Sequence, residues 1–306
     1  MDHLDVAVLA ALVRDPRAGY AEVGDRVGLS ANAVKARVRR LRDEGVLQGF
    51  AASPAPAVLG MGEGLLVFTE VPDLAEREED ILRTLPDAPG VRFVDVGVDG
   101  TVLVWAYASD AADWERVERA AVSVLGKPPA HAAFRPCAQP LDATPSDLRL
   151  LRALLPDARA GVGDLARRSG LSPKTVQRRL GALVESGRVR LEPVLSPSEA
   201  SGLVLFTLHV TLRPGAPLAE VLRLLPPGTI AQPSGVDHAL HVARPTLREA
   251  QADLRAVRRC PAVDRVVLAL ATRRRADAWL EDALAARLVP AQPAAPAPLP
   301  ISVRRG

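Results

Sequence analysis

A stretch near the N-terminus returns in changed form 142 residues later. Residues 28–45 read GLSANAVKARVRRLRDEG, and residues 170–187 read GLSPKTVQRRLGALVESG. The pairs that match at this spacing are Leu9 and Leu151, Leu12 and Leu154, Gly28 and Gly170, Leu29 and Leu171, Ser30 and Ser172, Val34 and Val176, Arg37 and Arg179, Leu41 and Leu183, Gly45 and Gly187, and Gly60 and Gly202. Self-similarity at a fixed period marks repeated structural units, so the chain is predicted to be a tandem of two.

The repeat extends beyond these helical stretches at a slightly different spacing. GLLVFTEV from Gly64 is similar to GLVLFTLHV from Gly202, and GVDG from Gly97 is similar to GVDH from Gly235. Each unit therefore spans roughly 140 residues, a length typical of one domain or of two small ones. Neither half of the chain should differ from the other in fold class.

Within each unit the hydrophobic pattern changes partway from helical to mixed. The first part predicts three short helices, with Ser30 and Ser172 as N-caps and Gly45 and Gly187 closing the third helices. The second part alternates strands and helices in a β-α-β-β-α-β order, which favours a ferredoxin-like α+β sandwich. The predicted domains are winged helix-turn-helix regions at 1–60 and 141–200 and ferredoxin-like regions at 61–140 and 201–275. Residues 276–306 are predicted to form a C-terminal helix and a disordered Pro/Ala-rich tail.

Composition narrows the class of protein. Hydrophobic residues make up 48% and charged residues 25% of the chain, as in ordinary globular proteins. Aromatic residues make up 3%, too few for the stacking surfaces of single-stranded nucleic-acid binders. The sequence predicts a cytoplasmic protein without a membrane span. Cys137 and Cys260 show no pairing pattern, acidic residues precede the first apolar run, and no apolar stretch is long enough to cross a membrane.

The strongest functional signal is the third helix of the first unit. Residues 30–42 carry five Lys/Arg side chains and no acidic one, although the whole chain has a net charge of only +3. Helical spacing points Val34, Val38 and Leu41 inward and leaves polar side chains outward. In a helix-turn-helix this second helix of the pair lies in the major groove, where Arg and Lys suit guanine and Asn suits adenine. The predicted DNA-binding residues are Ser30, Asn32, Lys35, Arg37, Arg39 and Arg40, and Ser172, Lys174, Arg178 and Arg179.

Residues 4–50 contain a Leu4-Asp5 pair, a GLS turn, an Arg37-Val38 pair and an EGVLQGF exit strand. In these features they resemble the N-terminal domain of the Lrp/AsnC (leucine-responsive/asparagine-responsive) transcription regulators. The resemblance implies a sequence-specific double-stranded DNA-binding regulator with an α+β domain that oligomerises and binds an amino acid or a related effector. By position it points to effector residues Gly97, Asp99, Gly235 and Asp237, where a plain hairpin turn is an equal alternative. It also implies a homo-oligomer, a dimer or tetramer of this double-length chain.

Fusion of two units allows one internal pseudo-dimer whose copies diverge. The second recognition helix has Gln177, Gly181, Ala182 and Val184 where the first has Lys35, Arg39, Arg40 and Arg42. Fewer phosphate contacts are therefore expected from the second copy, which is predicted to serve mainly in assembly. A protein whose winged helices dock other proteins is a further alternative for that copy.

The enzyme alternative is a tetrapyrrole enzyme similar to siroheme decarboxylases, which share this layout. Such chemistry would use His and Arg side chains, and His209, His238 and His241 are the candidates. The strand spacing of His238 and His241 is poor metal-ligand geometry, and no nucleophile–base pair stands out. The prediction is therefore a regulator without catalytic residues, metal or cofactor.

Overall fold

The computed structural model describes residues 1–97, 100–196, 199, 202–227, 229–234, 237–269, 272–275 and 278–288, with only the backbone of 232–234, 237, 269, 272–275 and 278. The first unit runs α1 (His3–Arg14), α2 (Tyr20–Val27), α3 (Ala31–Asp43), β1 (Leu47–Pro54), the 3-10 turn η1 (Pro56–Leu59), β2 (Gly62–Phe68), α4 (Leu74–Thr84), η2 (Leu85–Asp87), β3 (Val91–Val96), β4 (Val102–Ala108), α5 (Ala111–Leu125) and β5 (His131–Arg135). This order is the predicted helix-turn-helix, wing and β-α-β-β-α-β succession.

The second unit repeats the plan. It runs α6 (Pro145–Leu154), α7 (Val162–Ser169), α8 (Pro173–Glu185), β6 (Val189–Leu195), β7 (Val204–Leu212), α9 (Leu218–Leu222), β8 (Ile230–Ser234), β9 (Asp237–Arg244), α10 (Leu247–Arg258) and β10 (Val263–Ala269). A strand, β11 (Thr272–Arg275), and a helix, α11 (Ala278–Ala286), follow it. The α+β class and the tandem arrangement are thus confirmed.

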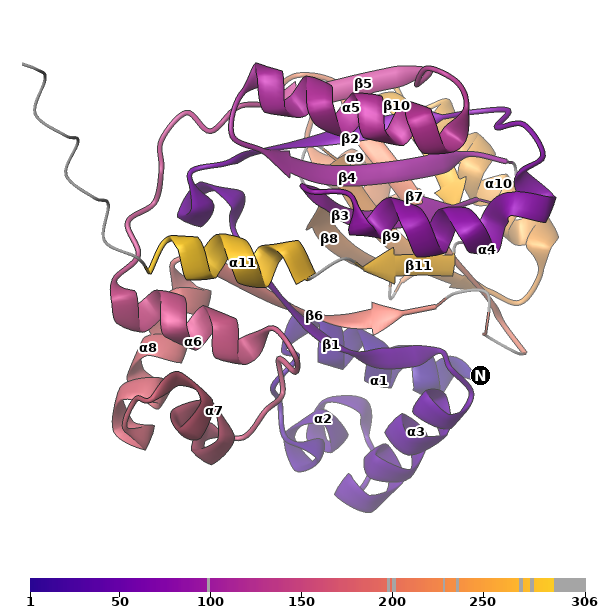
Figure 1. The fold of residues 1–306 in the computed structure, drawn as a ribbon. Coiled ribbons are helices and arrows are strands. Elements are labelled where there is room, and N and C mark those ends of the chain that lie inside the picture. Colours follow the sequence, from indigo (N-terminus) through magenta and orange to yellow (C-terminus); the bar gives the residue numbers. More distant parts are fainter. Residues whose placement is uncertain are drawn as a thin grey trace, which may run out of the picture.

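Both α+β sheets have the ferredoxin-like strand order. The second runs β10-β7-β9-β8, and the first runs β3-β4-β2-β5 with β11 added antiparallel to the β3 edge. Sequence reasoning did not predict this addition of a late strand to the first sheet. In Figure 1, β11 accordingly lies beside the strands of the first unit.

The two sheets pack against each other through the faces that their helices leave uncovered. Leu65, Leu103 and Trp105 of the first sheet form a buried cluster that Val267 of the second sheet contacts. The Trp105 and His209 rings lie 4.7 Å apart across this contact. The opposite faces are covered by α4 and α5 in the first unit and by α9 and α10 in the second. Burial on both faces fits the high apolar content of these strands.

Strands β1 and β6 join the two winged helices in an antiparallel ribbon. Phe50 pairs with Pro193, and Ala51 pairs with Glu192. Because Glu192 and Pro193 are the repeat counterparts of Phe50 and Ala51, each residue faces its neighbour's counterpart. This reciprocity is that of a two-fold axis, so the single chain reproduces the geometry of a symmetric dimer.

The C-terminal helix α11 completes the core of the winged helices. Leu280 and Leu284 are fully buried in the cluster that also contains Leu12, Leu41 and Leu151. At the same helix, Trp279 donates its indole N–H to the Val91 carbonyl at 2.6 Å. The predicted C-terminal helix therefore exists, and it fastens the winged helices to the first sheet. The predicted disordered tail lies outside the described residues.

Candidate nucleic-acid interface

Helix α3 is the best-equipped element for contacting DNA. The Ser30 hydroxyl accepts a hydrogen bond from the Ala33 N–H at 3.2 Å, and Val34, Val38 and Leu41 are buried as predicted. Asn32 and Lys35 are exposed, and the Arg39 side chain is 84% exposed. Helix α3 lies at the end of the molecule away from the two ferredoxin-like sheets (Figure 1). These three exposed side chains are the predicted site residues that remain available to a ligand.

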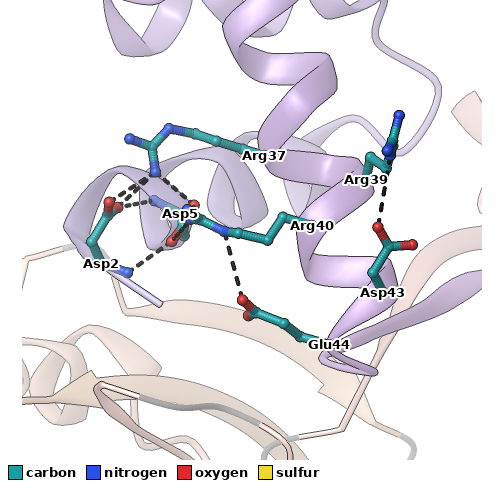
Figure 2. A network of polar contacts seen from close by, with 7 residues as sticks. All are labelled: Asp2, Asp5, Arg37, Arg39, Arg40, Asp43 and Glu44. Carbon is teal, nitrogen blue, oxygen red and sulfur yellow. Dashed lines mark hydrogen bonds and ion pairs between the residues drawn. The ribbon is translucent and has the colours of Figure 1, made fainter.

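Arg39 makes one exposed contact of 3.7 Å with Asp43 of its own helix, whereas two other predicted site residues are held by carboxylates of α1. Arg37 donates to Asp2 and to Asp5, and Arg40 donates to Asp5 at 2.6 Å (Figure 2). Asp5 is fully buried, whereas Arg39 points away from this cluster. Hydrogen bonds from Arg37 and from the Asp5 N–H lower the pKa of Asp2 from 3.8 to about 2, and the bonds to Asp2 and Asp5 raise that of Arg37. These contacts fasten α3 to α1, so they orient the recognition helix rather than leave both guanidinium groups free.

Helix α8 has the same frame with less charge. Ser172 caps it through the Thr175 N–H, and Pro173 occupies its first turn, where no N–H is needed. Arg179 donates to Asp147 at 2.8 Å, as its counterpart Arg37 does to Asp5. Burial alone would raise the pKa of Asp147, but hydrogen bonds from Thr144 and Arg179 lower it. Lys174 and Arg178 are exposed, and Ala182 stands where the first unit has Arg40.

A reciprocal pair of arginines joins the two winged helices. Arg17 donates to the carbonyls of Ala158 and Ala160, and Arg159 donates to those of Pro16 and Ala18, the latter two both at 2.9 Å. Burial and the nearby Arg159 charge lower the pKa of Arg17. Sequence reasoning missed this contact, although its signal was present. Residues 15–19 read DPRAG, and residues 157–161 read DARAG at the repeat spacing.

The predicted effector residues are only partly described. Gly97 donates its N–H to the Thr101 carbonyl at 2.7 Å and accepts one from Gly100, which makes a tight turn. Asp99 and Gly235 lie outside the described residues. Asp237 is described by its backbone alone, which pairs with Ser234. An effector at these turns therefore stays a prediction.

Two of the three candidate histidines lie buried between the sheets. His209 contacts Asp95 at 3.4 Å, and His241 shares a hydrogen bond with the Thr207 hydroxyl at 2.9 Å. The cavity described nearby, beside Arg92 and Tyr107, measures about 20 Å³, room for roughly one water molecule. That space is far too small for a tetrapyrrole. Over the described residues, no group of three or more His, Cys, Asp or Glu is arranged to hold a metal, and no helix is long and apolar enough to cross a membrane.

Two capped helix-turn-helix regions, each followed by a ferredoxin-like sheet, define a winged-helix protein of the DNA-binding class. The AsnC-type helix-turn-helix domain family matches residues 1–42, and a winged helix-turn-helix DNA-binding family matches residues 144–190.

An uncharacterized HTH-type transcriptional regulator of Pyrococcus abyssi is 28% identical over 144 residues, which cover 35% of this chain and 91% of that protein. The HTH-type transcriptional regulator LrpA of Mycobacterium tuberculosis is 42% identical over 60 residues, 20% of this chain and 40% of LrpA. These matches support the Lrp/AsnC family of transcription regulators for this chain.

Among solved structures, the siroheme decarboxylase NirDL is similar over 93% of this chain and 99% of its own, at 14% identity and a TM-score of 0.47. A likeness of that size carries no conclusion about activity. The helix-turn-helix relatives are named transcriptional regulators, which supports a regulator rather than an enzyme.

Proposed function

We propose that the chain is a sequence-specific double-stranded DNA-binding regulator that reads DNA mainly with α3. The observation that carries this proposal is the exposure of Asn32, Lys35 and Arg39 on one capped helix whose other side is fixed to α1. A recognition helix held in one orientation loses little conformational entropy on binding, so its base contacts contribute more to affinity. Asn32 suits adenine, and Arg39 or Lys35 suits guanine.

The remaining parts of the proposal follow the family. We infer that Ser30 and Ser172, with Lys174 and Arg178, contact phosphates at the helix N-termini. An amino acid or related molecule would act at the turns around Gly97 and Asp237, and two or four chains would assemble. The domain limits at residues 60, 140, 200 and 275 are part of the same proposal, as is a cytoplasmic location.

Fluorescence anisotropy with the gene's own upstream DNA and a shuffled fragment tests DNA binding. The double variant Lys35→Ala/Arg39→Ala should abolish the preference for the upstream fragment. The matched control is Arg116→Ala/Arg119→Ala, which removes the same charge from exposed, ion-paired positions on α5, on the far side of the sheets (Figure 1). Equal losses in both variants would mean that net charge alone accounts for the effect. They would contradict the proposal that α3 recognises the DNA sequence.

The tetrapyrrole alternative has its own test. A decarboxylase would need room between the sheets, where Trp105 packs against His209. Absorbance titration with an iron tetrapyrrole, comparing the wild-type chain with His209→Ala, measures whether one binds there. A Soret shift that depends on His209 would favour the enzyme over the regulator.

A further inference from the structure

The contact between the two winged helices has two sides, which the repeat makes equivalent in sequence. We call the first seam the side where Arg159 lies over the rings of Tyr20 and Phe50. The second seam is the side where Arg17 lies beside Val162 and Val184. The Arg159 guanidinium lies 4.9 Å from the Phe50 ring centroid and 5.4 Å from that of Tyr20. Arg42 covers the Phe50 ring at 5.8 Å. Stacked cations and rings therefore fill the first seam.

The second seam has the same backbone arrangement but lacks the aromatic rings and the second stacked arginine. Val162 and Glu192 stand where the first seam has Tyr20 and Phe50, and Val184 stands where it has Arg42. Arg39 is replaced by Gly181, where an added Cβ atom would meet no other heavy atom within 4 Å. Val184 is 43% exposed. With Val162 in place of Tyr20 and Val184 in place of Arg42, this side of the contact contains a groove.

The groove has a volume of about 930 Å³, within the range of small-molecule sites. Its apolar lining includes Val13, Val162, Leu180 and Val184, and Arg14, Arg17, Arg26 and Arg190 also line it. Arg26 pairs with Glu22, and Arg190 with Glu192. Arg14 is exposed and makes no ion pair within the described part of the chain. Asp15 is the acidic residue of the lining, so cationic groups outnumber carboxylates.

These features select a ligand with a flat apolar body and one negative charge. We propose that the second seam binds a small aromatic carboxylate. Its ring occupies the place beside Arg17 that Tyr20 occupies beside Arg159, and its carboxylate pairs with Arg14. A phosphodiester would satisfy the guanidinium groups but would leave the apolar floor of Val162, Leu180 and Val184 uncovered. This ligand site goes beyond the proposed function, since ligand binding needs no DNA.

Isothermal titration calorimetry of the full chain with 2-naphthoate, in the absence of DNA, tests the site. Binding should weaken about tenfold or more when Gly181→Arg/Val184→Arg restores the first-unit side chains. The matched control is Ala182→Arg on the same helix, which restores a first-unit arginine next to Asp147 and Arg179, away from the groove. This control should bind as the wild-type chain does. Near-UV circular dichroism checks that each variant is folded.

A second comparison tests the charge. The neutral analogue 2-naphthalenemethanol should bind more weakly than 2-naphthoate, and Arg14→Ala should remove most of that difference. No binding of 2-naphthoate up to its solubility limit would overturn the inference. Equal binding of acid and alcohol would do the same, as would binding that Gly181→Arg/Val184→Arg leaves unchanged. Failure of the DNA experiment with 2-naphthoate binding intact would refute the proposed function alone.

Discussion

The first and second winged helices share one backbone plan but differ in the number and the partners of their charged side chains. In the first, Asp5 is fully buried and accepts hydrogen bonds from both Arg37 and Arg40, and the outward face still carries Lys35 and Arg39. In the second, Asp147 accepts from Arg179, while Gly181, Ala182 and Val184 replace the remaining arginines. Duplication thus preserved the contact that orients the helix and let the ligand-facing side chains diverge.

Removal of the carboxylate that holds the recognition helix, Asp5 in the first unit and Asp147 in the second, should give the largest difference in stability between the units. Asp5→Ala leaves two guanidinium groups without their buried partner and should lower the free energy of unfolding by about 3 kcal/mol. Asp147→Ala removes one ion pair and the exposed hydrogen bonds from Thr144, and should lower it by about 1.5 kcal/mol. Urea denaturation of the full chain, followed by circular dichroism, measures both. Equal losses would mean that Arg40 adds nothing to the first cluster.

Loss of the outward charges should affect DNA binding more in the first unit than in the second. Lys35→Ala/Arg39→Ala should weaken binding about tenfold or more and reduce the slope of log K against log salt by about 2. Lys174→Ala/Arg178→Ala removes the same charge from α8 and should reduce both quantities less. Anisotropy titrations at several salt concentrations decide the matter. A larger effect from the α8 variant would make the second helix the main reading head.

Arg17 and Arg159, the reciprocal pair between the winged helices, should differ in how much they stabilise the fold. Arg159→Ala loses two hydrogen bonds and the contact with two rings, whereas Arg17→Ala loses two hydrogen bonds. The Arg159 variant should therefore be the less stable of the two by about 1 kcal/mol. Thermal unfolding of both variants under one buffer condition provides the comparison, and a more stable Arg159 variant would contradict the filled first seam.

Lowering the pH should give the smallest difference in stability between the two units. The pKa of Asp2 is about 2 in the folded chain, below its ordinary 3.8, so its contribution to stability is complete above pH 4 and is lost as the pH falls toward 2. The first unit should therefore lose a stabilising contact in that window, and Asp2→Asn should flatten the dependence slightly. Carboxyl NMR titration of Asp2 checks the pKa, and a value near 3.8 would argue against its pairing with Arg37.

Much of this architecture follows from local sequence patterns. The spacing of Val34, Val38 and Leu41 sets the inward face of α3, and alternating apolar strands give the β-α-β-β-α-β order. The partners of Arg37 and Arg40 could not be predicted in this way, because helical periodicity says which face a side chain occupies and nothing about the carboxylates on α1. The pairing of β11 with β3 was likewise beyond reach, since it joins a short, charged segment to a strand about 180 residues earlier.

The late position of β11 and α11 in the sequence has a consequence for biosynthesis. The β3 edge cannot be completed until the ribosome has passed residue 275, and the Leu280–Leu284 part of the winged-helix core must wait until residue 284. At about 5–20 residues per second, the first sheet waits with an open strand edge for roughly 10 to 30 seconds after β3 is made. An open edge of this kind invites pairing with other nascent chains. The part of the protein that is translated first is therefore sealed last, and a premature stop before β11 would release it unsealed.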